Sequence, residues 1–124
     1  MGVKSYRDLL VWQKAIDLVV ECYRLSKKLP ASEIYGLASQ IQRAAVSVPA
    51  NIAEGHGIDH LNDYTRHLSI AKGSLMEIET HLAITHRLSY LPEQELDFAA
   101  GLAAEVGRML EGLSRSLKAS AAHQ

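Results

Sequence analysis

The chain has 124 residues, of which 48% are hydrophobic and 22% charged, values typical of one globular domain and too few residues for two. Thirteen Lys and Arg residues against fourteen Asp and Glu residues give a net charge of -1, so the overall charge does not indicate a nucleic-acid-binding protein. The single cysteine excludes an internal disulfide, and the apolar runs are shorter than the ~20 residues of a membrane span. We therefore expect a cytoplasmic protein without membrane contact.

Four segments, at about residues 9–29, 35–56, 60–88 and 92–119, space their apolar residues with the period of a helix. No segment alternates with a period of two for long enough to form a strand. Short connections between consecutive helices make them antiparallel neighbours. The chain is therefore predicted to fold as one all-α domain over residues 1–124, an up-down-up-down four-helix bundle.

The segment at residues 9–29 carries more apolar surface than one bundle core requires. Any row that the core does not use must be covered by a second copy of the chain or by long side chains such as those of Arg24 and Lys27. We expect a homo-oligomer to cover it. The two neighbouring rows are Val11, Ala15, Leu18, Cys22 and Leu25, and Trp12, Ile16, Val19 and Tyr23.

The segment at residues 35–56 contains the stretch RAAVSVPANIAEGHG, with Pro49 inside the helical pattern. Val48 and Ile52 continue the inward row that precedes the proline, so we predict a kink in one helix rather than a break between two. Ser47 and Asn51 are predicted to hydrogen-bond the backbone groups that the proline leaves free. The role assigned to this stretch is structural.

The segments at residues 60–88 and 92–119 repeat apolar residues at steps of three and four, as packed helices do. Reflecting the second and third helices about the turn near Ile58 and Asp59 predicts which residues face each other. The two ion pairs would mainly fix the register of the helices. The predicted pairs are Ala44 with Gly73, Arg43 with Glu77, and Glu54 with Arg66.

Charge is uneven along the chain. Residues 1–28 hold six basic and three acidic residues, a balance of +3, and the remaining residues hold seven basic and eleven acidic ones, a balance of -4. A ring of identical subunits would repeat the basic patch and hold phosphates. The alternative is an ordinary solvated face with ion pairs along the helix. The candidate nucleic-acid-binding residues are Arg7, Lys14, Arg24, Lys27 and Lys28.

No pattern in the sequence indicates catalysis, a cofactor or a metal ion. His60, His67 and His81 would lie about 10.5 and 21 Å apart along a helix, too far to share an ion. We expect them to line a seam between helices or subunits, where protonation near pH 6.5 would loosen packing. There is no nucleophile motif and no glycine-rich phosphate loop. Three glycines of the fourth helix are predicted to be close-packing positions: Gly101, Gly107 and Gly112.

Four stretches occur in the order and spacing of a known family: YRDLLVWQKAIDLVVECYRL, GLASQIQRAAVSVPANIAEG, AKGSLMEIETHL and GRMLEGL. The chain resembles the four-helix-bundle proteins of the 23S rRNA intervening-sequence family, some of which are encoded in extra segments of bacterial 23S rRNA genes. That family is similar to the accessory protein of diversity-generating retroelements, a basic homopentamer that works with a reverse transcriptase and RNA. The resemblance implies a non-enzymatic bundle, a ring-like homo-oligomer of five subunits, and RNA or a ribonucleoprotein as partner.

Two functional hypotheses follow. The first is an oligomeric adaptor that contacts RNA or a ribosome-related ribonucleoprotein through the basic patch. The alternative is a protein-interaction scaffold without nucleic-acid contact. RNA binding that weakens with salt would favour the first, and a protein partner that survives nuclease treatment would favour the second.

Overall fold

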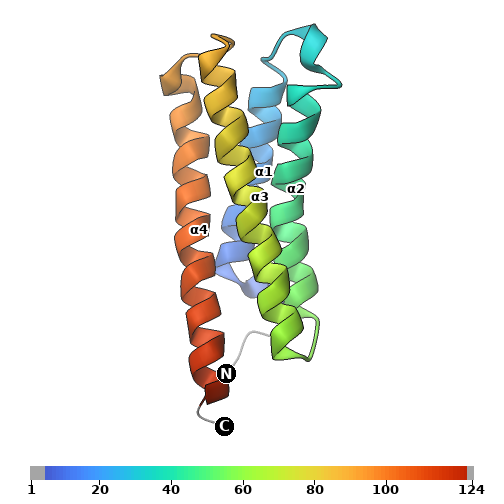
Figure 1. Ribbon diagram of the computed structural model, residues 1–124, viewed down its shortest axis with the longest axis vertical. Coiled ribbons are helices and arrows are strands. Elements are labelled where there is room, and N and C mark those ends of the chain that lie inside the picture. Colours follow the sequence, from blue (N-terminus) through green and yellow to red (C-terminus); the bar gives the residue numbers. More distant parts are fainter. Residues whose placement is uncertain (1–4, 123–124) are drawn as a thin grey trace.

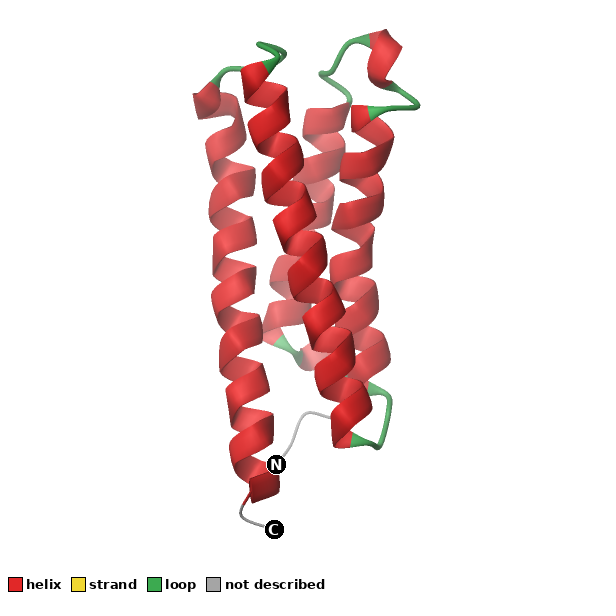
Figure 2. Ribbon diagram, viewed as in Figure 1, coloured by secondary structure: helices red, strands yellow, loops and turns green. Residues whose placement is uncertain are grey.

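The computed structural model describes residues 5–122 and contains four long helices, with no strand among these residues. This confirms the predicted all-α four-helix bundle (Figure 2). In Figure 1 the sequence colours run up α1, down α2, up α3 and down α4. Two short 3-10 helices precede α1 and α2. The elements are η1 (Tyr6–Asp8), α1 (Leu10–Ser26), η2 (Ala31–Glu33), α2 (Leu37–His56), α3 (Leu61–Arg87) and α4 (Glu93–Ala122).

The helix ends differ from the predicted bounds by at most three residues, and the end of α2 at His56 is as predicted. The helix α1 ends at Ser26, before the predicted stop at residue 29, and the Ser26 hydroxyl donates to the carbonyl of Cys22 at 2.7 Å. The helix α2 begins at Leu37, two residues later than predicted. There the Glu33 carboxylate accepts the Leu37 N–H at 3.0 Å and so satisfies one of the free donors of the helix start.

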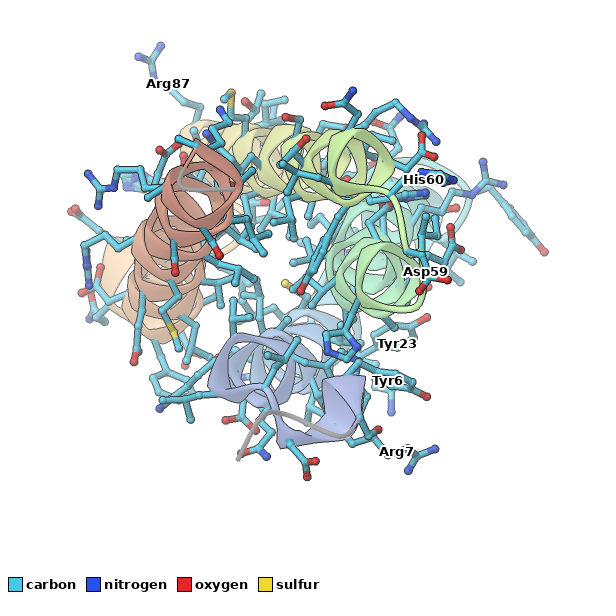
Figure 3. The ribbon with its side chains drawn as sticks, turned by 90° about the horizontal axis from the view of Figure 1, so that it is seen from below. Tyr6, Arg7, Tyr23, Asp59, His60 and Arg87 are labelled. Atoms are coloured by element: carbon cyan, nitrogen blue, oxygen red, sulfur yellow. The ribbon has the colours of Figure 1, made fainter. Side chains whose placement is uncertain are left out.

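Each helix packs against two neighbours, in the order α1, α2, α3, α4 and back to α1. Viewed from its end, the bundle is a square with α1 opposite α3 and α2 opposite α4 (Figure 3). The apolar residues at helical spacing meet in the centre, as predicted. The largest fully buried side chains include Leu18, Leu25, Ile41, Ile52, Leu68, Ile78 and Leu110.

The two apolar rows of α1 have different environments. The row from Val11 to Leu25 is buried in the core. In the other row, Trp12 packs edge-on against Tyr6 of η1, with ring centroids 5.3 Å apart, and is only partly exposed. Tyr23 is exposed, and so is Val20, three residues before it. The bundle core therefore uses the first row in full, Trp12 and Val19 of the second row pack against it, and the apolar surface left over lies on the outer side of α1.

Pro49 lies inside α2, which continues through it to His56. The proline is therefore not a break between two elements, and a bend at this point stays a prediction. Pro49 itself is buried. The side chain of Asn51 donates to the carbonyl of Ser47 at 2.9 Å, which is not the Ala45 carbonyl that Pro49 leaves free, so the predicted contact with the freed group stays a prediction. The hydroxyl of Ser47 bonds side chains instead.

Candidate functional site

Three of the five candidate nucleic-acid-binding residues are engaged by carboxylates. Lys14 lies 3.7 Å from Glu105, and Lys28 lies 2.9 Å from Glu95, both on α4. Arg24 donates two hydrogen bonds to Glu21, at 2.8 and 2.6 Å. These side chains lie along the edge of α1 that faces α4. Their charge is largely cancelled within the chain, contrary to what a repeated phosphate-binding patch requires.

The carboxylates that engage these cations were not identified from the sequence. The hydrogen bond from Lys28, together with its charge, holds the pKa of Glu95 below its usual range. Glu21 is only 6% exposed, and the fork of the Arg24 guanidinium satisfies both of its carboxylate oxygens.

Arg7 and Lys27 have no carboxylate within 4.0 Å among the described residues. Arg7 follows Tyr6 and lies over its ring, 5.7 Å from the centroid, with its guanidinium pointing away from the bundle (Figure 3). Lys27 directly follows the other end of α1. The five candidates therefore do not form one surface.

A polar seam connects α2 and α3 in the lower half of the bundle. The hydroxyl of Ser74 donates to that of Ser47 at 2.8 Å, and Asn51 donates to Ser47 at 3.0 Å. The Asn51 carbonyl oxygen lies 2.9 Å from Nδ1 of His67, which also lies 3.6 Å from Glu54. His67 is thus at a helix seam, as predicted. These five side chains satisfy one another and specify how the two helices align.

The two ion pairs predicted across α2 and α3 are not present among the described residues. Arg66 lies 3.9 Å from Asp63 of its own helix, and Glu54 lies near His67 instead. Arg43 and Glu77 are exposed and form no ion pair among the described residues. The contacts show that the true register is shifted by a few residues from the reflected one, because the turn between the helices does not lie midway between facing residues.

The glycines also have roles other than those predicted. A Cβ atom at Gly73, Gly101 or Gly112 would meet nothing within 4 Å, and one at Gly107 would lie at an ordinary 3.7 Å from Leu75. Close packing therefore does not explain them within the chain. The close approach is at Gly55, where a Cβ atom would lie 2.9 Å from the Tyr64 ring and 3.0 Å from Cβ of His67.

A hydrogen bond links the two loops at the other end of the bundle. The hydroxyl of Tyr90, in the α3–α4 connection, donates to the Glu33 carboxylate at 2.7 Å. Together with the N–H of Leu37, it lowers the pKa of Glu33, and the same bond raises the pKa of Tyr90. No signal in the sequence joins these two residues, which are 57 positions apart.

Two surfaces remain without an internal partner. The outer α1–α2 face, defined by Val20, Tyr23 and Val46, leaves these apolar side chains 65%, 37% and 43% exposed. Grooves of about 460 and 400 Å³ adjoin it, with Arg43 at one and Lys27 at the other. The second surface is a groove between α3 and α4, floored by Leu75, Ala103 and Gly107 and flanked by charged residues.

No three His, Cys, Asp or Glu side chains among residues 5–122 come together as metal ligands. Burial, with the neighbouring Glu21 carboxylate, raises the pKa of the Cys22 thiol to about 12, so Cys22 stays a neutral core residue. Over the same stretch of chain, no helix is both long and apolar enough to cross a membrane.

Comparisons with known proteins agree with the fold. A family model described as "23S rRNA-intervening sequence protein" matches residues 7–112. A crystal structure of a protein with unknown function from the S23 ribosomal protein family of Bacteroides thetaiotaomicron VPI-5482 is similar, with a TM-score of 0.79 and 24% sequence identity over 85% of this chain and 98% of that one. No curated protein sequence matches. The chain therefore belongs to the 23S rRNA-intervening sequence protein family.

Proposed function

We propose that the protein is a non-enzymatic scaffold of the cytoplasm that assembles with copies of itself through the outer α1–α2 face. The observation that carries this proposal is the exposure of Val20, Tyr23 and Val46 on that face. Apolar surface gains about 25 cal/mol for each Å² removed from water, so a second copy that covers these side chains is stabilised.

The alternative cover by long side chains of the same chain receives no support from the contacts. Arg24 is turned toward Glu21 and Glu95, and so toward α4. Lys27 is exposed, and Val20 remains 65% exposed beside these residues. A partner from outside the chain is the remaining way to cover the face.

The assembly that we propose is a closed ring of five subunits, the arrangement implied by the resemblance to the retroelement accessory protein. A ring arises when one surface of each subunit binds a different surface of the next, and the rotation closes. The outer α1–α2 face would be one of these two surfaces.

The test is the mass of the particle in solution, measured by sedimentation or light scattering. Val20→Lys places a charge on the outer face and should reduce the particle to smaller species. Phe98→Lys is the matched control, because Phe98 is 64% exposed on α4 and lies outside that face. Both variants should keep the helix content of the wild type. An unchanged particle mass for Val20→Lys would contradict the proposal.

A second candidate function is contact with RNA or a ribosome-related ribonucleoprotein. The observation in its favour is that Lys27 and Arg43, two cations without a carboxylate partner, border the grooves of the outer α1–α2 face. The family description refers to 23S rRNA, which points to the same class of partner. A ring would repeat both cations once per subunit.

An anisotropy titration of a structured RNA fragment, at low and near-physiological salt, tests this candidate. Saturable binding that weakens as salt rises, and that falls further in Lys27→Glu and Arg43→Glu, would support it. Lys118→Glu is a control outside the face. If no binding occurs even at low salt, the protein-interaction scaffold without nucleic-acid contact remains.

A further inference from the structure

The groove between α3 and α4 runs along most of the two helices. It consists of a hollow of about 640 Å³ and a second of about 240 Å³, and Glu79 lines both. The floor is apolar, with Leu75, Ala103 and Gly107 in the first hollow. Met76, at its edge, is 62% exposed. The bundle therefore leaves a long apolar channel open on this side.

One stripe of α4 lines this groove from end to end. Apart from Gly107, which lies beside Arg108, its residues follow one another at steps of three or four, so they share one side of the helix. This stripe is separate from the buried row of α4, which includes Ala99, Val106 and Leu110. The members of the stripe are Glu93, Asp97, Ala100, Ala104, Gly107, Arg108, Glu111 and Arg115.

The charges on the stripe are separated along the helix. Its N-terminal end carries Glu93 and Asp97, and its C-terminal end carries Arg108 and Arg115. None of these four side chains forms an ion pair among the described residues. Glu111 lies between the two arginines but is already paired with Lys72 of α3. Each end thus offers free charge of one sign.

The stripe is complementary to itself when one copy is turned end for end. We infer that two copies of this chain pair through the α3–α4 groove, with α4 of each copy lying antiparallel in the groove of the other. The acidic end of each stripe then faces the arginine end of its partner. Such a contact has two-fold symmetry, so every charge pair occurs twice.

The small residues support the same arrangement. The midpoint between the acidic pair and the arginine pair falls close to Ala104, and Ala100 and Gly107 lie on either side of it. Small side chains at the crossing point let two helices approach closely, since interaxial distance depends on the side chains at the contact. Gly107, which has no packing reason within the chain, lies where the second α4 would come nearest.

This pairing does not require the ring proposed above. The α3–α4 groove and the outer α1–α2 face lie on opposite sides of the bundle (Figure 3), so both contacts can form in one particle. A wild-type particle that uses both contacts would be a pair of rings if the two-fold axis of the groove contact crosses the ring axis at right angles. If only the groove contact forms, the particle is a dimer.

Charge reversal with rescue tests the pairing by particle mass. Arg108→Glu with Arg115→Glu places acid against acid in both halves of the contact, and the particle mass should fall twofold. Glu93→Lys with Asp97→Lys should have the same effect. All four changes together restore opposite charges and should restore the wild-type mass, because each reversed end meets a reversed partner. All these side chains are exposed, so the fold should persist.

A cysteine trap gives an independent measurement. The two-fold axis brings Ala104 close to its own copy, so Ala104→Cys should form a disulfide-linked dimer under mild oxidation. Ala50→Cys is the matched control, an exposed alanine on α2 that should stay unlinked. The native Cys22 is fully buried and does not compete.

The outcomes separate this inference from the proposed function. Loss of half the mass in the α4 reversals, rescue in the combined variant and a linked Ala104→Cys dimer would support the groove contact. A particle mass unchanged by either reversal, or an Ala104→Cys chain that links no more than Ala50→Cys, would overturn it. Val20→Lys alone reports on the outer α1–α2 face, and its failure leaves the groove result standing.

Discussion

The α2–α3 seam and the α3–α4 groove are two sides of the same helix with opposite packing. The α2–α3 contact is the most extensive in the bundle, and its polar side chains bond one another across it. The α3–α4 contact is less extensive and leaves an open channel above Leu75 and Gly107. The polar groups of the α2–α3 seam are hydrogen-bonded within one chain. Apolar and charged groups of the α3–α4 groove instead face outward from the bundle.

The comparison shows that the same residue type has different neighbours, and so a different effect on packing, on the two sides of α3. Gly55 allows Tyr64 and His67 to approach α2, whereas Gly73 and Gly101 have empty space around them. Asn51 is hydrogen-bonded within the seam, whereas Arg108 and Arg115 of the groove form no ion pair among the described residues. The same substitution, glycine to alanine, should therefore destabilise the protein at Gly55 and stabilise it at Gly73 and Gly101.

The two largest effects are expected in the α2–α3 seam, and one of them is at Gly55. In Gly55→Ala, the new Cβ atom would lie 2.9 Å from the Tyr64 ring and 3.3 Å from its backbone carbonyl, so α3 would have to move. Overpacking of this kind costs about 1–3 kcal/mol, against a gain of about 1 kcal/mol from helix propensity. We expect a lower free energy of unfolding in urea. An Ala variant as stable as the wild type would show that the seam tolerates separation.

The next effect is expected at Asn51. Asn51→Leu removes the partner of His67 Nδ1 and the donor to the Ser47 carbonyl, and leaves buried polar groups unpaired. Such groups cost about 1–3 kcal/mol each. The control is Asn62→Leu, an exposed position of α3. Equal stability of the two variants by urea titration would contradict the role of the polar seam.

Alanine substitution should raise stability at the two glycines where a Cβ atom would meet nothing within 4 Å, Gly73 and Gly101. Gly101→Ala and Gly73→Ala should each raise the free energy of unfolding by about 0.5–1 kcal/mol, because alanine loses less backbone entropy in a helix and meets no clash. Thermal unfolding of the two single variants measures this. A destabilised Gly101→Ala would mean that something packs on this part of α4 after all.

The smallest effect is expected at the hydrogen bond between Tyr90 and Glu33, which links the α3–α4 connection to the α1–α2 connection. Because the folded pKa of Glu33 is lowered below its usual value of 4.5, its contribution is present above that pH and is lost as pH falls through the folded pKa. Glu33→Gln should therefore lower the melting temperature at pH 7, and the difference should shrink toward pH 3. Glu77→Gln, an exposed glutamate without an ion pair, is the control. A difference that does not change with pH would exclude the carboxylate as its cause.

Much of the fold could be predicted from single residues and their spacing. The rows through Leu18, Ile41, Ile78 and Leu110 place four helices around one core, because apolar residues at steps of three and four share a helix face. Of the second apolar row of α1, Tyr23 is exposed and the other three members are partly buried, whereas Val20, which belongs to neither predicted row, is 65% exposed. These features depend on local spacing, which the sequence states directly.

The candidate site could be predicted only in part, because charges and glycines take their role from the neighbouring helix. The pairing of Lys28 with Glu95 and of His67 with Asn51 depends on helix register, which changes with one or two residues in a turn. By itself, the sequence determined the helices, the core rows and the surplus apolar surface of α1. The tertiary structure decided which cations are neutralised, which glycine is a close approach and which side of α4 stays open, since these depend on distances between segments far apart in the chain.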